Sequence, residues 1–193
     1  PPGGVEPADS GSDAGETADA GPQCVATSDH PTGRSDFASV VDLTRNRVVI
    51  HGGDSGPSVN CNPSPKLEGD AWAFDLTCGN WTLLSTNSPA ARTRHVSVLD
   101  TQRNRLVIYG GRYRSGTSGN YTVYSEVHAF DLATDQWSQL SPTGTSPPGL
   151  TSASAVYDAS ADRMLIFGGN SSISALNYMP QNDVWALNFA ANT

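Results

Sequence analysis

The chain has 193 residues, of which 16% are charged, and its formal net charge is −8. This length suits one ordinary domain or a piece of a larger one, and an acidic chain does not attract phosphate backbones, so we expect no nucleic acid partner. No apolar run reaches transmembrane length and no signal peptide is visible, so we expect a mature chain whose leader was removed before Pro1.

The first 22 residues differ in composition from the rest of the chain. Residues 1–22 hold five of the 19 acidic residues and none of the 11 basic ones, and Val5 is their only large aliphatic side chain. Such a segment buries too little apolar surface to offset the entropy of ordering, which predicts a disordered linker. Its small and acidic residues are typical of a bacterial envelope linker. We therefore expect an extracytoplasmic protein, secreted or tethered to the envelope through this segment.

The remaining residues, 23–193, contain a repeat. RVVIHGG at 47–53, RLVIYGG at 105–111 and RMLIFGG at 163–169 each start 58 residues after the previous copy. A fixed period of this length indicates a repeat architecture. A β-sandwich would explain the turn signals between strands but not a strict period.

Each copy carries strand signals in the same order. A first strand leads into a polar hairpin turn, the second strand ends on a glycine pair, a long loop follows, and a third strand largely alternates apolar with polar or small residues. Two copies add a fourth strand that starts at a tryptophan. The first strands are expected at 37–42, 95–100 and 153–158, the turns begin at Asp42, Asp100 and Asp158, the third strands lie at 70–76, 126–132 and 183–189, and the fourth strands begin at Trp81 and Trp137.

Four-stranded units of this period are typical of propeller blades. With its glycine pairs, aromatic third strands and two tryptophans, the chain resembles the kelch-repeat family over residues 23–193. The resemblance implies an all-β fold, a kelch-type β-propeller with three four-stranded blades in this chain. It does not imply one activity, because propellers serve many functions.

Three blades are fewer than the four to eight of ordinary propellers. The third copy lacks a fourth strand after residues 183–189, whereas residues 23–27 lie 58 positions before the fourth strand of the first copy. Either the chain is a fragment of a larger propeller, or two copies form a six-bladed ring. We favour a homodimer in which residues 23–27 of each copy complete the last blade of the other.

The three cysteines are Cys24, Cys61 and Cys78. A disulfide is expected outside the cell, and Cys61–Cys78 is the favoured pair because both residues lie in loops of the first repeat. Cys24 would then be buried or bonded to another chain. The alternative is three reduced, buried cysteines.

The long loops between second and third strands share one face of a propeller with the loops that enter each first strand, and loops on a rigid scaffold commonly carry function. Arginine and tyrosine gather there, and together they suit a protein, a carboxylate or a carbohydrate. An alternative for Arg92, Arg94 and His95 is a structural role, bridging blades through loop carbonyls. The candidate ligand-binding residues are Arg34, Arg92, Arg94, His95, Arg112, Tyr113, Arg114, Tyr121 and Tyr124.

No catalytic signature stands out, and no cofactor or metal is expected. His51 occupies the position of Tyr109 and Phe167 in the other copies, which indicates a packing residue. The sequence therefore predicts a non-enzymatic binding or assembly module that uses the loop face. The alternative is a sugar-active enzyme of the kelch type, a mutarotase or an oxidase.

Overall fold

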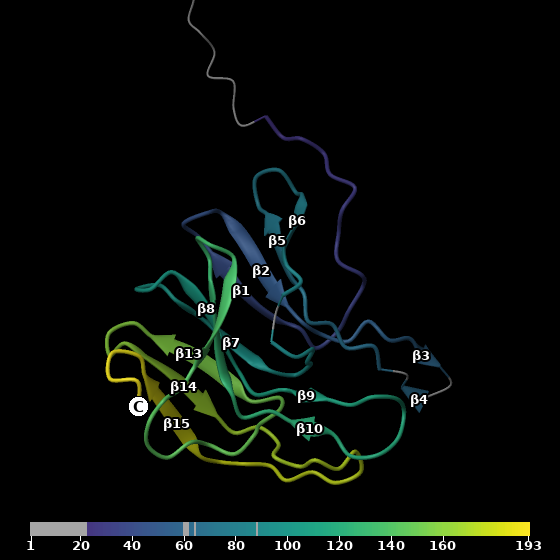
Figure 1. Cartoon of the computed structure of the whole chain (residues 1–193), viewed down its shortest axis with the longest axis vertical. Helices are drawn as coiled ribbons and strands as arrows, with labels where there is room; N and C mark the ends of the chain where they lie inside the picture. The colour runs from purple at the N-terminus through teal and green to yellow at the C-terminus, as the bar shows by residue number, and fades with distance from the viewer. Residues whose placement is uncertain (1–22, 60–61, 64, 88) are drawn as a thin grey trace, which may run out of the picture.

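A computed structural model describes residues 23–59, 62–63, 65–87 and 89–193. Within these ranges the chain forms strands and no helix, so no helix there could cross a membrane. Three antiparallel sheets stack as successive blades, with the first strands of neighbouring blades in contact (Figure 1). This confirms the all-β propeller architecture. The predicted linker, residues 1–22, lies outside the described residues.

The first two blades have four strands each, in the order expected from the repeat. Blade 1 contains β1 (Ala38–Asp42), β2 (Arg47–His51), β5 (Ala71–Asp75) and β6 (Trp81–Ser85). Blade 2 contains β7 (Val96–Asp100), β8 (Arg105–Tyr109), β11 (Val127–Asp131) and β12 (Gln136–Leu140).

The third blade has three strands within the described residues, β13 (Ser154–Asp158), β14 (Arg163–Phe167) and β15 (Val184–Asn188). Two short hairpins extend from the loops of the first two blades. They are β3 (Ser58–Val59) with β4 (Asn62–Pro63), and β9 (Arg112–Tyr113) with β10 (Thr122–Val123).

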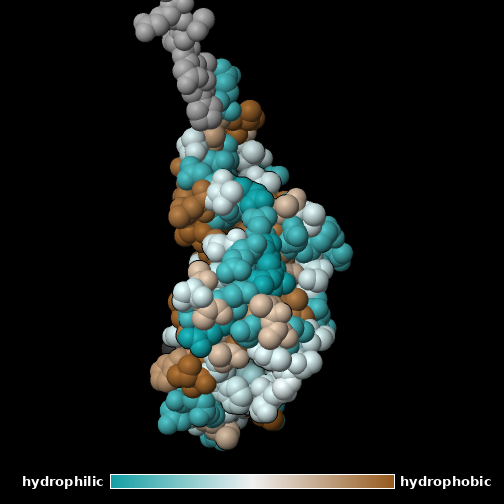
Figure 2. Space-filling model, turned by 90° about the vertical axis from the view of Figure 1, so that its left-hand side faces the viewer, coloured by the Kyte–Doolittle hydropathy of each residue, from teal (hydrophilic) through white to brown (hydrophobic). Residues whose placement is uncertain are grey.

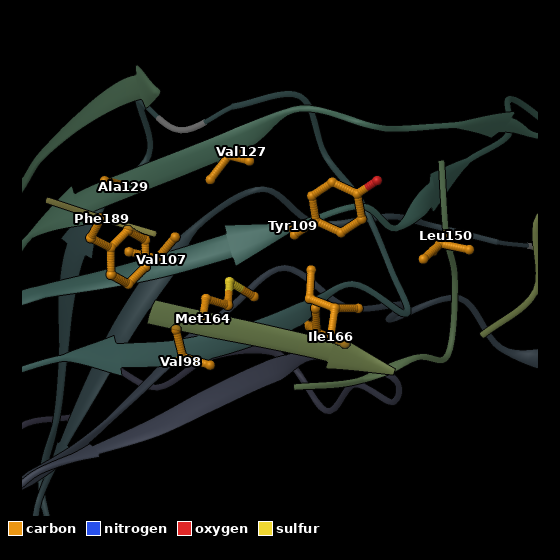
Figure 3. Packing of buried hydrophobic residues seen from close by; sticks show 10 residues of the cluster. Val98, Val107, Tyr109, Val127, Ala129, Leu150, Met164, Ile166 and Phe189 are labelled. Carbon is orange, nitrogen blue, oxygen red and sulfur yellow. The ribbon is translucent and has the colours of Figure 1, made fainter. Parts of the chain in front are cut away.

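The core consists of side chains between blades. Between blades 2 and 3, Val107 and Tyr109 of β8 pack against Met164 and Ile166 of β14 (Figure 3). A second cluster, between blades 1 and 2, includes the fully buried Phe130. Since burying one such side chain contributes about 1.5–3 kcal/mol, each blade depends on its neighbour for stability.

The side with the tight β-turns is held by a repeated polar network. The first residue of each turn accepts a hydrogen bond from the arginine that opens the second strand, as Asp100 does from Arg105 Nε at 2.8 Å. Arg103 then reaches into the next blade and pairs with Asp162, Nη2 to Oδ2, at 2.6 Å. Polar residues accordingly run down the middle of this side (Figure 2). The expected turn roles are confirmed, since Asn104 and Asp162 adopt φ of 51° and 48°.

The glycine pairs permit both a sharp bend and a close approach between blades. Gly110 and Gly111 have φ of 73° and 90°, a region that favours glycine. A Cβ at Gly110 would lie 2.4 Å from the carbonyl oxygen of Leu150 in the loop that enters blade 3. The recurring pair therefore sets how closely successive blades can pack.

The segment before blade 1 differs from expectation. Residues 23–27 form no strand in this single chain, and the disulfide joins Cys24 to Cys78. The favoured Cys61–Cys78 pair is thus wrong, and Cys61 lies outside the described residues. The physical reason is that this segment runs beside the β5–β6 turn, where Asn80 Nδ2 donates to Val25 O and Thr27 Oγ1 donates to Trp81 O at 3.2 Å.

Candidate binding face

The long loops lie together on one side of the molecule. The β3–β4 hairpin, the β9–β10 hairpin and the loop 170–182 extend beyond the glycine ends of the strands, on the right in Figure 1. The nine candidate residues all come from this side, but the structure separates four with structural roles from four that form a cluster, and it leaves Tyr113 outside both groups.

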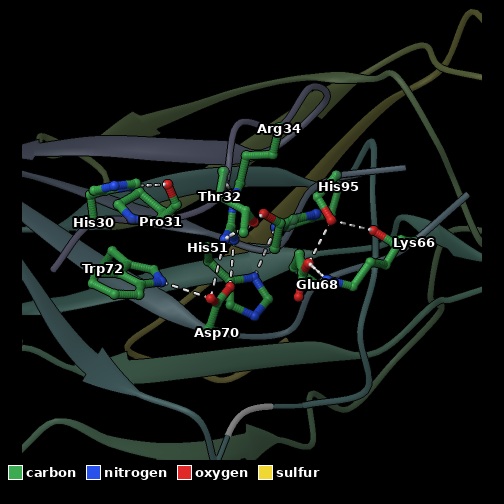
Figure 4. Close-up of polar contacts among 12 residues, drawn as sticks. His30, Pro31, Thr32, Arg34, His51, Lys66, Glu68, Asp70, Trp72 and His95 are labelled. Atoms are coloured by element: carbon green, nitrogen blue, oxygen red, sulfur yellow. Dashed lines mark hydrogen bonds and ion pairs between the residues drawn. The ribbon is translucent and has the colours of Figure 1, made fainter. Parts of the chain in front are cut away.

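Arg34 has a structural role. Its guanidinium binds the carboxylate of Asp70, with Nη2 to Oδ2 at 3.2 Å, and Nη1 donates to the carbonyl of Gly52 at 3.2 Å. Its side chain is only 3% exposed. Asp70 also accepts from Trp72 Nε1, so the three side chains form one network within blade 1 (Figure 4). The hydrogen bonds from Arg34 and Trp72 lower the pKa of Asp70 against the opposing effect of its burial.

Arg92 and Tyr124 are also structural. Arg92 is 1% exposed, donates to the carbonyl of Gly110 at 3.0 Å and stacks over the Tyr124 ring at 4.1 Å. Burial lowers its pKa, and the nearby Glu126 opposes this. Arg92 thus bridges the loop entering blade 2 to its glycine pair, as the structural alternative for this residue anticipated.

His95 lies in the interior beside His51. Their ring nitrogens, Nε2 of His95 and Nδ1 of His51, are 3.0 Å apart (Figure 4). The His51 ring also packs on Trp137 of β12, with 4.7 Å between the ring centres. Burial and neighbouring positive charge lower the pKa of His51 to about 3 and hold that of His95 well below its usual value. Both rings are therefore neutral packing groups at physiological pH.

The remaining arginines gather around Tyr121. The guanidinium carbons of Arg112 and Arg114 lie 3.9 and 4.4 Å from the centre of its ring. Arg94 lies close enough to Arg112 for its charge to lower the pKa of that residue. It also forms an ion pair with Asp36, with Nε to Oδ2 at 2.9 Å. We call Arg94, Arg112, Arg114 and Tyr121 the arginine–tyrosine cluster.

Two members of the cluster, Arg112 and Arg114, carry positive charge that no ion pair among the described residues neutralises. Burial lowers the pKa of Arg112, and the like charge of Arg94 lowers it further. No carboxylate in the described part of the chain forms an ion pair with Arg112 or Arg114, and the buried Nε atoms of both lack an acceptor there. A guanidinium without a carboxylate partner is suited to pairing with an anionic group.

Asp36 and Tyr178 belong to this site but were not among the sequence candidates. Asp36 lies 58 positions before Arg94, so the period could have indicated that the two occupy equivalent places. Tyr178, in the loop 170–182, is 75% exposed and interacts electrostatically with Arg94 and Arg112. Tyr113 is 36% exposed and pairs with Thr122 in the hairpin, and no contact places it in the cluster.

A family model described as the KLHDC2/KLHL20/DRC7 kelch-repeats domain matches residues 22–193. The chain belongs to the kelch-repeat family. A solved structure of YjhT shares the fold, with a TM-score of 0.54 and 19% identity over 74% of this chain and 35% of that one.

Similar sequences occur in much longer proteins. Human host cell factor 2 is 33% identical over 91 residues, which are 47% of this chain and 10% of that protein. Acyl-CoA-binding domain-containing protein 5 of Arabidopsis thaliana is 28% identical over 122 residues, 62% of this chain and 18% of that protein. Kelch domain-containing protein 2 of Bos taurus is 26% identical over 121 residues, 63% of this chain and 25% of that protein.

Proposed function

We propose that this chain is a non-enzymatic protein-binding module that takes an acidic segment of its partner on the arginine–tyrosine cluster. Kelch propellers are typically protein-binding, which supports the general class. The observation that carries the specific proposal is the position of Arg112 and Arg114 against the ring of Tyr121 without carboxylate partners in the described chain.

The chemistry of the cluster fits a carboxylate. A guanidinium presents a planar set of donors that matches the two oxygens of an Asp or Glu side chain. Stacking on Tyr121 holds the two guanidiniums in place, so less side-chain entropy is lost when a ligand arrives. Arginine and tyrosine are also the residue types that dominate the energetics of protein interfaces.

Binding to a panel of labelled peptides of matched length tests this proposal. We expect acidic peptides to bind more tightly than otherwise identical peptides in which Asp and Glu are replaced by Asn and Gln. Arg112→Gln should weaken the acidic peptides at least tenfold without lowering the melting temperature. The control is Arg163→Gln, because Arg163 lies on the opposite, turn side of the molecule and its side chain is 43% exposed.

Two results would contradict the proposal. One is equal affinity for acidic and amide peptides. The other is turnover of a sugar by the purified chain, which would favour the sugar-active enzyme instead. A glycan array distinguishes a carbohydrate ligand, which the same donors could also accept, from a peptide.

The module is further proposed to act outside the cytoplasm, either secreted or tethered through residues 1–22. The disulfide between Cys24 and Cys78 supports this location, because disulfides persist in oxidising compartments. Alkylation of the denatured, unreduced protein should label only Cys61. Labelling of all three cysteines would contradict an oxidised, extracytoplasmic protein.

A further inference from the structure

The carboxylate of Asp36 lies at the edge of the arginine–tyrosine cluster. Its Oδ2 accepts a hydrogen bond from Arg94 Nε at 2.9 Å, and the side chains of Asp36 and Arg94 are 42% and 33% exposed. No other carboxylate of the described residues forms an ion pair with an arginine of the cluster. An anionic ligand that approaches Arg94 from solvent therefore meets a negative charge that the protein has already placed there.

Main-chain contacts hold Asp36 close to both Arg94 and Arg112. The Asp36 carbonyl accepts from the Arg94 amide at 2.9 Å and from Thr93 Oγ1 at 3.1 Å. Thr93 is buried and pairs with Arg112, amide to carbonyl, at 3.1 and 2.9 Å. Burial and the charge of Arg94 lower the pKa of Arg112, and the negative charge of Asp36 opposes them. One carboxylate thus acts on two of the three arginines in the cluster.

The fold does not explain why a carboxylate stands at this position. Asp36, Arg94 and Ser152 occupy equivalent positions before the first strands of the three blades, with φ of 55°, 58° and 54°. The position requires a left-handed backbone, and the three copies meet this requirement with an acidic, a basic and a neutral residue. An ion pair as exposed as Asp36 with Arg94 contributes little to stability. The charge of Asp36 is better explained by an effect on what binds beside it.

We infer, on the basis of the proposed function, that Asp36 determines specificity at the cluster by engaging Arg94 and restricting the site to a segment with one isolated carboxylate. That carboxylate binds Arg112 and Arg114, which have no carboxylate partner in the described chain. A second acidic side chain next to the first would have to displace Asp36 from Arg94 or lie beside its charge. Like charges brought together at an interface oppose binding, and an unfavourable contact of this kind is a common source of specificity.

The test compares two labelled Gly–Ser peptides, one with a single central Glu and one with two adjacent Glu, by nuclear magnetic resonance titration of the full chain. On the wild type, the second Glu should change the affinity by about twofold or less, because Asp36 opposes it. In Asp36→Asn the second Glu should tighten binding by about fivefold or more, because Arg94 is then free to pair with it. Asparagine tolerates positive φ, so this substitution removes the charge and keeps the backbone.

Asp135→Asn is the matched control. Asp135 also has a φ of 55°, so the substitution removes the same charge from the same backbone conformation. It lies in the turn between β11 and β12, on the opposite, turn side of the molecule, and should leave the ratio of the two affinities as in the wild type. The double variant Asp36→Asn, Arg94→Gln should lose the gain from the second Glu, because Arg94 is the group that provides it.

An unchanged ratio in Asp36→Asn would overturn the inference. A gain that survives Arg94→Gln, or that also occurs in Asp135→Asn, would overturn it too, because the effect would then come from net charge alone. These outcomes leave the proposed function standing as long as the single-Glu peptide binds and Arg112→Gln weakens it. If neither peptide binds the wild type, the proposed function fails, and the role of Asp36 fails with it.

Discussion

At the scale of single residues, similar side chains in this protein have different roles because burial separates them. Arg92 and Arg112 both stack on a tyrosine, but Arg92 is 1% exposed and its Nη1 binds a carbonyl of the chain, whereas Arg112 has no carboxylate partner in the described residues. The first arginine stabilises the fold, and the second is the one that we propose for ligand binding. Residue type alone cannot make this distinction, so the sequence grouped both as binding residues.

The buried histidines predict how stability depends on pH. The folded-state pKa of His51, about 3, and that of His95 both lie below the ordinary value of 6.5. Below pH 6.5 the unfolded chain therefore binds protons that the folded chain does not, and stability falls as pH falls toward 3. The loss is about 1.4 kcal/mol per pH unit for each histidine.

Thermal melts between pH 7 and 5 check this expectation. The melting temperature of the wild type should fall with pH, and His51→Phe should reduce the slope, since it removes one of the three histidines whose pKa is lowered in the folded chain. Phenylalanine already stands at the equivalent position of blade 3, as Phe167. An identical slope in the wild type and in His51→Phe would refute the linkage.

At the scale of strands and loops, the repeat made most of the fold predictable. The glycine pairs, the turn aspartates and the tryptophans Trp81 and Trp137 placed the strands of each blade in order, because backbone conformation at these points depends on local residue type. The short hairpins β3–β4 and β9–β10 were expected only as loops, since two-residue strands carry too little pattern to be recognised.

Interactions between distant segments could not be predicted in the same way. The disulfide joins residues 54 positions apart, and proximity along the chain wrongly favoured Cys61 as the partner of Cys78. The loop 170–182 brings Tyr178 toward Arg94 through tertiary structure alone. The period did contain one usable signal, because it aligns Asp36 with Arg94, two residues that form an ion pair across neighbouring blades.

At the scale of the whole molecule, the blades form a rigid support on which the loops present charge. The turn side is neutralised by repeated Asp–Arg pairs, such as Asp100 with Arg105 and Asp162 with Arg103. The loop side instead retains positive charge at the arginine–tyrosine cluster, within a chain whose net charge is −8. Under the proposed function, this asymmetry is what would orient an acidic partner toward the loop face.

A double-mutant cycle tests the central claim most directly. Arg112→Gln in the protein is combined with Glu→Gln at single positions of the tightest acidic peptide, and affinities of all four combinations are measured. We predict a coupling free energy of about 1.5 kcal/mol or more at one peptide position, as found for close charge pairs at interfaces. Coupling near zero at every acidic position would contradict recognition of a carboxylate by the arginine–tyrosine cluster.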